Sequence, residues 1–110
     1  MTINRAAVRC DRVGDHLTLF LTGELDCASA GELGTQVIPF ILPTDERVRV
    51  DLSGVTFCGS AGLTLFVQLH NLVRDRGGEL TFYAPPATVM RSIELCRLDE
   101  LLTIARPLTV

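Results

Sequence analysis

The amino-acid sequence predicts a single α/β domain with a mostly parallel central sheet and an antiparallel hairpin at its N-terminus. Strand-like and helix-like segments follow one another in the order β-β-α-β-α-β-α-β. Strands separated by helices are joined by right-handed crossovers and therefore run parallel. A chain of 110 residues suits one domain of ordinary size, and it contains no repeat or low-complexity linker. We therefore expect one domain over residues 1–110.

The N-terminal hairpin is predicted over residues 6–26, with the turn at Val13-Gly14-Asp15. After the turn, leucines at positions 17, 19 and 21 alternate with residues 18, 20 and 22. Both faces of this strand are fairly apolar, which is typical of a strand inside a sheet. The strand is therefore expected to be central rather than an edge.

The first helix is predicted over residues 29–41. Ser29 followed three residues later by Glu32 forms the S-x-x-E pattern of a capping box. Leu33, Val37 and Phe40 mark its inner face, and the prolines at positions 39 and 43 limit it. Residues 43–47 are expected to form a surface loop.

The second half of the chain predicts two more crossovers. Residues 47–52 alternate charged and apolar side chains, as a half-buried strand does. A helix follows from about residue 60 to 76, and Gly77 is placed to form its left-handed C-cap. A strand at 79–84, a helix at 87–98 opened by Pro86, and a short last strand complete the sheet.

Composition and charge exclude several classes of protein. The net charge is −3 and no basic run occurs, so nucleic acid is not an expected partner. The N-terminal residues do not resemble a signal peptide, and no apolar run is long enough to span a membrane. We therefore expect a cytoplasmic protein with no membrane association.

The four cysteines at positions 10, 27, 58 and 96 are irregularly spaced and form no C-x-x-C pair. With only two histidines in the chain, this spacing does not predict a zinc site or any other metal site. Reduced thiols that serve mostly as small buried hydrophobic side chains are expected instead. Cys58 would be redox-sensitive if a helix N-terminus lowered its pKa.

The stretch FCGSAGL at residues 57–63 places Ser60 between two glycines, at the junction between a predicted strand and a predicted helix. A plain N-cap is the structural interpretation. A catalytic nucleophile would need a general base, but His70 lies nearly three turns further along the helix. A phosphate-binding loop would need a lysine, and the chain has none. Because no general base is placed to activate Ser60, an enzyme is not expected. Phosphorylation of Ser60 by another protein is compatible with its position at a helix N-terminus.

A polar stripe runs along the predicted helix below Ser60. At 100° per residue, Thr64, Gln68, Asn71 and Asp75 fall within a narrow arc of an otherwise apolar helix. Ser60 lies near the head of this stripe, at the end of the helix that carries unpaired N–H groups and positive dipole character.

These segments together resemble a STAS domain, specifically a bacterial anti-sigma factor antagonist. Residues 21–33, LTGELDCASAGEL, are similar to that family's G-E-L-D segment. Residues 50–63, VDLSGVTFCGSAGL, are similar to its D-L-S-x-V-x-F-x-D-S-S-G-L segment. Residues 77–104 are similar to its closing strand, helix and strand. The resemblance covers nearly the whole chain, with the motifs in order and at the expected spacing.

The resemblance implies a partner-switching function. The unphosphorylated protein would bind an anti-sigma factor, usually a serine kinase, and so release a sigma factor. The kinase would then phosphorylate the antagonist, with Ser60 matching the phosphoacceptor and Asp26 matching the acidic residue beside it. The kinase brings the ATP and magnesium, so no cofactor is expected for this chain. The oligomeric state is expected to be a monomer or a weak homodimer.

One position departs from the family pattern. Where the family often has Asp before the acceptor, this chain has Gly59, and Ala61 follows Ser60. The loss of the Asp motivates an alternative function: a constitutive STAS scaffold module that is not regulated by phosphorylation. A small-ligand or nucleotide-binding module is a third, weakly supported alternative. Asp26 is open to two compatible interpretations, as a cap of the first helix and as a partner contact.

The expected partner surface combines the loop after the second strand, the turn before Ser60 and the exposed face of the following helix. Two further hydroxyls, Ser53 at the end of a strand and Ser92 in a helix, are expected to be structural. The predicted partner-binding residues are Asp26, Gly59, Ser60, Ala61, Gly62, Thr64, Val67 and Gln68.

Overall fold

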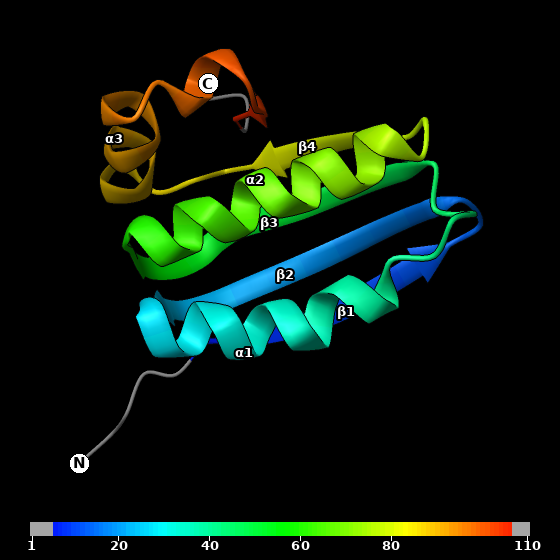
Figure 1. Cartoon of the computed structure of the whole chain (residues 1–110), viewed down its shortest axis with the longest axis horizontal. Coiled ribbons are helices and arrows are strands. Elements are labelled where there is room, and N and C mark those ends of the chain that lie inside the picture. Colours follow the sequence, from blue (N-terminus) through cyan, green and yellow to red (C-terminus); the bar gives the residue numbers. More distant parts are fainter. Residues whose placement is uncertain (1–5, 107–110) are drawn as a thin grey trace.

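The computed structural model describes residues 6–106 and shows a mixed five-stranded sheet with three α-helices (Figure 1). The elements in chain order are β1 (Ala7–Val13), β2 (His16–Leu25), α1 (Cys27–Val37), η1 (Ile38–Phe40), β3 (Arg47–Cys58), α2 (Ser60–Asp75), β4 (Glu79–Tyr83), α3 (Ala87–Leu95), η2 (Leu98–Glu100) and β5 (Thr103–Ala105). The spatial order is β1-β2-β3-β4-β5, with β1 antiparallel to β2 and the other pairs parallel. The predicted fold class is confirmed.

The core lies between the sheet and the pair α1 and α2, which lie side by side across one face of the sheet (Figure 1). Leucines of β2 and valines of β3 point toward these helices and are buried. On α2, Phe66 packs against Phe82 of β4 with their ring centroids 5.0 Å apart. Alternating strand residues and one apolar helix stripe therefore build a single core. Within residues 6–106, no helix is long and apolar enough to cross a membrane.

The hairpin forms as predicted, and β2 lies inside the sheet. The face of β2 away from α1 and α2 is not covered by a helix, so Thr18 and Phe20 are half-buried. On this open face Arg9 lies 4.2 Å from the ring centroid of Phe20, and Arg49 lies 3.6 Å from that of Tyr83. Stacked guanidinium groups thus cover the two aromatic rings that helices leave exposed.

The strand predicted at residues 47–52 is too short, because β3 continues to Cys58. Its pairing with β4 ends at Asp51–Tyr83, but its pairing with β2 continues to Leu25–Cys58. Two register shifts against β2 insert extra residues into β3 after Asp51. Ser53 therefore lies within the strand, where its hydroxyl donates a 2.6 Å hydrogen bond to Asp51.

Helix α1 differs from the prediction at both ends. It begins at Cys27 rather than near Ser29, and its capping box consists of Asp26 and Ser29 rather than Ser29 and Glu32. Leu33 and Val37 are buried as expected, but Phe40 is 51% exposed, because Pro39 turns the chain into the short helix η1. The expected inner-face role of Phe40 is therefore wrong.

The loop after η1 is tied to β1 by an ion pair. Asp45 is buried, and both of its oxygens accept 2.8 Å hydrogen bonds from Arg12. Asp45 also accepts a 2.7 Å bond from the backbone N–H of Leu42. The loop lies on the surface as predicted, and Asp45, its buried residue, fastens it to the hairpin.

The later elements follow the sequence prediction, except that α3 ends at Leu95 rather than at the predicted residue 98, because Arg97 is in the left-handed region with a φ of +57°. Helix α2 ends at Asp75, and Gly77 has a φ of +83°, in the left-handed region expected of a C-cap. Pro86 caps α3, and the hydroxyl of Ser92 bonds the backbone of Thr88 within that helix. Helix α3 packs beside the part of β3 that extends past β4, which buries Val89 and Ile93.

Candidate functional site

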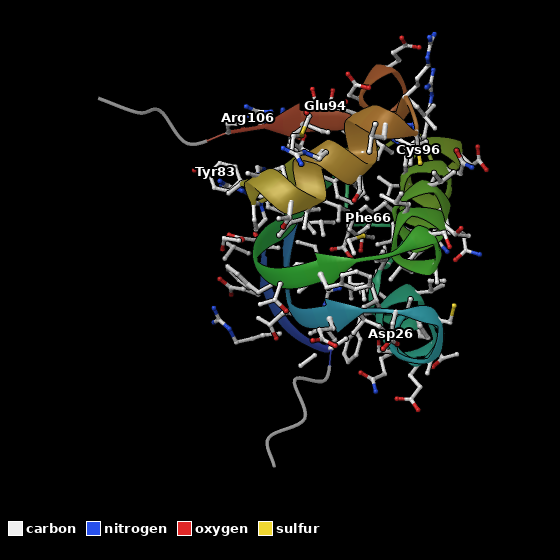
Figure 2. All side chains as sticks on the ribbon, turned by 90° about the vertical axis from the view of Figure 1, so that its left-hand side faces the viewer. Asp26, Phe66, Tyr83, Glu94, Cys96 and Arg106 are labelled. Atoms are coloured by element: carbon white, nitrogen blue, oxygen red, sulfur yellow. The ribbon has the colours of Figure 1, made fainter. Side chains whose placement is uncertain are left out.

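The predicted site residues come together at the C-terminal ends of β2 and β3. Leu25 and Cys58 are paired across the sheet, and the N–H of Gly59 donates a 3.0 Å hydrogen bond to the carbonyl of Leu25. Asp26 and Gly59 therefore follow neighbouring strand ends, and α1 and α2 begin next to each other. This end of the sheet faces the viewer in Figure 2, where Asp26 lies at the start of α1.

Asp26 is the N-cap of α1. One oxygen of its carboxylate accepts hydrogen bonds from the backbone N–H groups of Ala28 and Ser29, at 3.1 and 2.9 Å. The hydroxyl of Ser29 accepts a 3.0 Å bond from the N–H of Asp26 and also lies 2.6 Å from the carbonyl of Glu24. The backbone N–H and the hydroxyl of Ser29 both donate hydrogen bonds to the carboxylate of Asp26, and these bonds lower its pKa. This exposed carboxylate is therefore charged at neutral pH. Its predicted capping role is confirmed.

Ser60 is the first residue of α2, and Gly59 is the N-cap. The interpretation of Ser60 as a plain N-cap is therefore wrong. Its side chain is exposed, and within residues 6–106 its hydroxyl has no hydrogen-bond partner. The backbone carbonyl of Ser60 accepts a 2.9 Å bond from the hydroxyl of Thr64. Ser60 thus presents a free hydroxyl to solvent at the positive end of α2.

Gly62 is buried and allows the first turn of α2 to rest directly on the ends of β2 and β3. A β-carbon placed on it would lie 2.7 Å from the sulfur of Cys58 and 2.8 Å from the β-carbon of Leu25. Such distances are too short for non-bonded atoms, so no side chain fits without movement of its neighbours. Gly62 is therefore a packing residue, and its predicted contact with a partner stays a prediction.

The other predicted contacts of α2 lie along one side of the helix. Thr64 and Gln68 are exposed, and Ala61 and Val67 are half-buried. Asn71 and Asp75 are exposed as well, which confirms the predicted polar stripe. Gln68 also borders a shallow hollow of about 520 Å³ between α1 and α2, lined mainly by Ala30, Gly31, Gly34, Thr35, Ile38 and Pro39.

The thiols are less uniform than the sequence predicts. Cys58 is buried, and burial raises its pKa from 9.0 to about 11. It is therefore an unreactive thiol, and the idea that the helix N-terminus makes it redox-sensitive is wrong. Cys27 and Cys96 are exposed rather than buried, and Cys10 is half-buried.

Neither histidine can serve Ser60 as a general base. His16 lies at the N-terminal end of β2, the opposite end from Leu25. His70 is ten residues after Ser60 on α2, which corresponds to about 15 Å along a helix. It is buried, and within residues 6–106 both of its ring nitrogens lack a hydrogen-bond partner.

Phe57 is an exposed residue beside the predicted site residues that the sequence reasoning missed. Its side chain is 51% exposed although it lies in β3, one residue before the end of the strand. Its ring lies beside Gly59, 3.3 Å from the position of a β-carbon built there. The predicted strand ended at residue 52, so no side of the sheet was predicted for Phe57; in the structure the second register shift of β3 falls between Val55 and Phe57.

Comparison with known proteins agrees with this architecture. A family model described as "Mlab, STAS domain" matches residues 8–103. The chain belongs to the STAS domain family. Over 94 residues this STAS domain is 27% identical to a Listeria monocytogenes protein named anti-sigma-B factor antagonist, a match that covers 86% of this chain and 82% of the relative.

Two solved structures show how similar the fold of this STAS domain is to others. The crystal structure of an anti-sigma factor antagonist from Mycobacterium paratuberculosis superposes with a TM-score of 0.80 at 21% identity, covering 91% of this chain and 85% of that one. The phosphorylated form of the Bacillus cell fate determinant SpoIIAA superposes with a TM-score of 0.68 at 15% identity, covering 90% and 91%. At these identities the likeness concerns the fold.

Proposed function

We propose that this STAS domain is an anti-sigma factor antagonist that binds an anti-sigma factor of the serine kinase type and is released when that kinase phosphorylates Ser60. The single observation that carries the proposal is the free hydroxyl of Ser60, exposed at the first turn of α2 beside the carboxylate-capped start of α1. The names of the sequence relatives support the class of partner. Its site of action would be the bacterial cytoplasm.

The proposed contact surface surrounds this hydroxyl. It comprises Asp26, Gly59, Ser60 and Ala61 at the ends of the two strands, and Thr64, Val67 and Gln68 along α2. The exposed aromatic ring of Phe57 extends it on the side of β3. A surface with one apolar anchor among small and polar side chains is typical of a specific but reversible interface.

Phosphorylation would act on this surface through charge. A phosphate adds about −1.5 to −2 charges at neutral pH, and the uncapped N-terminus of α2 accommodates that charge without loss of the fold. Asp26 already places a carboxylate at the neighbouring helix start. The two negative groups together would repel an acidic partner surface and raise the cost of desolvating the interface.

The decisive experiment combines mass spectrometry with binding. Purified kinase-type anti-sigma factors from the source bacterium are incubated with the chain and ATP, and the intact mass of the wild type is compared with that of Ser60→Ala. We expect one added phosphate on the wild type and none on the variant. Ser60→Asp should lose affinity for the same kinase, whereas Asn71→Asp, which adds the same charge further along α2, should not. Equal affinity of wild type and Ser60→Asp would refute the switch.

The role of Phe57 has a matched control within the chain. Phe40 has the same exposure, 51%, but lies in η1 at the opposite end of α1. We expect Phe57→Ala to weaken binding of the anti-sigma factor by about tenfold or more, and Phe40→Ala to leave it unchanged. Equal effects of the two substitutions would remove Phe57 from the interface.

A constitutive scaffold module remains the second candidate, favoured by Gly59. This position lacks the acidic side chain that the family pattern places before the acceptor, and α2 has no side-chain cap. A scaffold would form higher-order assemblies with other STAS proteins and would gain no mass with kinase and ATP. Light scattering of the mixture together with the intact-mass measurement separates the two candidates.

A further inference from the structure

The two edges of the sheet differ in how well they are protected against pairing with another strand. β5 is an edge of only three residues, Thr103–Ala105. β1 is an edge of seven residues, Ala7–Val13, and it contains neither proline nor glycine. A long regular edge strand presents a row of unpaired backbone groups, which proteins usually block with short length, proline or a bulge. β1 has none of these three devices, and its charged side chains, Arg9, Asp11 and Arg12, are of both signs rather than of one repelling sign.

The pairing of β1 with β2 determines which backbone groups point outward. Val13 and His16 flank a two-residue turn and are paired, as are Asp11 with Thr18 and Arg9 with Phe20. In such a hairpin the flanking pair is hydrogen-bonded and the pattern alternates along the strand. The N–H and C=O groups of Val8, Cys10 and Arg12 therefore point away from β2, toward the free edge.

The sequence of β1 is self-complementary about Cys10. If two copies pair antiparallel with Cys10 on the two-fold axis, Val8 lies opposite Arg12 of the second copy, so that outward-pointing backbone groups meet each other. This register uses all seven residues of the strand. It also places Arg9 directly opposite Asp11 of the second copy, twice by symmetry. Opposite charges directly across neighbouring strands stabilise the pair.

The side chains of β1 are available for this contact. Arg9 and Asp11 are exposed on the open face of the sheet, and within residues 6–106 Asp11 has no ion-pair partner. Arg9 uses the face of its guanidinium against Phe20, which leaves the N–H groups at its rim for a carboxylate. On the other face, Val8 and Cys10 are only half-buried, so α1, which lies in front of β1 in Figure 1, does not close over this edge.

We propose that two copies of this chain associate through antiparallel pairing of their β1 strands in the register centred on Cys10, which joins the two sheets into one. The contact lies along the β1 edge, whereas Ser60 lies at the start of α2, so both copies keep their partner surfaces. Because the stabilising charges are solvent-exposed, the dimer should weaken as salt is added.

Charge exchange between the two strands tests this register. Sedimentation velocity from micromolar to millimolar concentration should show wild-type dimers, and Arg9→Asp and Asp11→Arg should each raise the dissociation constant at least about tenfold. Mixing the two variants should restore association as a heterodimer, because each Asp again faces an Arg. Circular dichroism confirms that both variants are folded, and Asp11→Arg removes no contact within the chain.

A thiol cross-link provides the second test. Paired residues of this kind have Cα atoms about 5.5 Å apart, within disulfide range. In a Cys27→Ser/Cys96→Ser background, diamide at mildly alkaline pH should yield a covalent dimer that Cys10→Ser abolishes; the alkaline pH is needed because burial raises the pKa of Cys10. A wild type that sediments as a monomer at every concentration, or variants that dimerise as the wild type does, would overturn the proposal.

Discussion

The starts of α1 and α2 lie next to each other at one end of the sheet, yet they are held in different ways. The first turn of α1 is held by polar contacts, because Asp26 accepts hydrogen bonds from Ala28 and Ser29. The first turn of α2 is held by packing, because Gly62 rests against Leu25 and Cys58 while no side chain caps the helix. The first N–H groups of α1 are thus already hydrogen-bonded, whereas those of α2 are left for an incoming negatively charged group.

This difference explains why a switch would be placed on α2 rather than α1. A phosphate on the first turn of α1 would meet the carboxylate of Asp26 and N–H groups already in use. A phosphate on Ser60 meets an uncapped helix N-terminus, which favours negative charge. Packing through Gly62 also keeps α2 in place without help from the residues that a partner would contact.

The largest effect on stability is expected when the close packing of the first turn of α2 is disrupted. Gly62→Ala introduces a β-carbon less than 3 Å from Cys58 and Leu25 and should lower the free energy of unfolding by about 2–3 kcal/mol. Urea denaturation followed by circular dichroism measures this. Gly31→Ala in α1 is the control, since open space surrounds that position, and it should leave stability unchanged or slightly raised.

Alkaline pH should destabilise the same packed region, because it ionises the thiol of Cys58. Its folded-state pKa of about 11 lies above the usual 9.0, so folding favours the protonated thiol. The stability it contributes is present below pH 9 and is lost as pH rises toward 11. The free energy of unfolding, measured by denaturation at a series of pH values from 9 to 11, should therefore fall more steeply with pH in the wild type than in Cys58→Ala. A decline that is identical in both proteins would show that the thiol is not responsible.

A smaller effect is expected at the start of α1. Asp26→Ala removes the cap and should lower Tm by about 5 °C. Because the pKa of Asp26 is lowered in the folded state, its contribution is present above its unfolded value and is lost as pH falls through the folded value. The difference in Tm between wild type and variant should therefore shrink below about pH 4. A constant difference down to strong acid would contradict the capping role.

The smallest change in stability is expected when α2 is given the kind of cap that α1 has. Gly59 has an ordinary φ of −87°, so Asp fits the backbone, but its β-carbon would lie 3.3 Å from the ring of Phe57. Gly59→Asp should therefore raise the free energy of unfolding by a few tenths of a kcal/mol at most. Under the proposed function it should also speed phosphorylation of Ser60, which a time course of intact mass measures. Gly59→Asn supplies the cap without the charge.

The capping boxes show where sequence reasoning reaches its limit. Asp26 and Ser29 are both of the residue types that cap helix N-termini, but only Ser29-x-x-Glu32 fits the S-x-x-E pattern of a capping box. The choice depends on where β2 ends, and that is decided by the pairing of Leu25 with Cys58 thirty-three positions away. A local pattern carries no information about that pairing. The hairpin, α2 and its glycine C-cap were predictable because turn chemistry and helical periodicity are local.

The sequence by itself determined the order of the elements, the mixed sheet and the position of Ser60 at a strand-to-helix junction, because periodicity and glycine placement encode them directly. Only the tertiary structure decided that Phe57 is exposed, that Gly62 is buried and that β1 forms a long free edge. Each of these depends on which strands lie side by side and where their registers shift. Burial and edge position are properties of the assembled sheet, and no short stretch of sequence contains them.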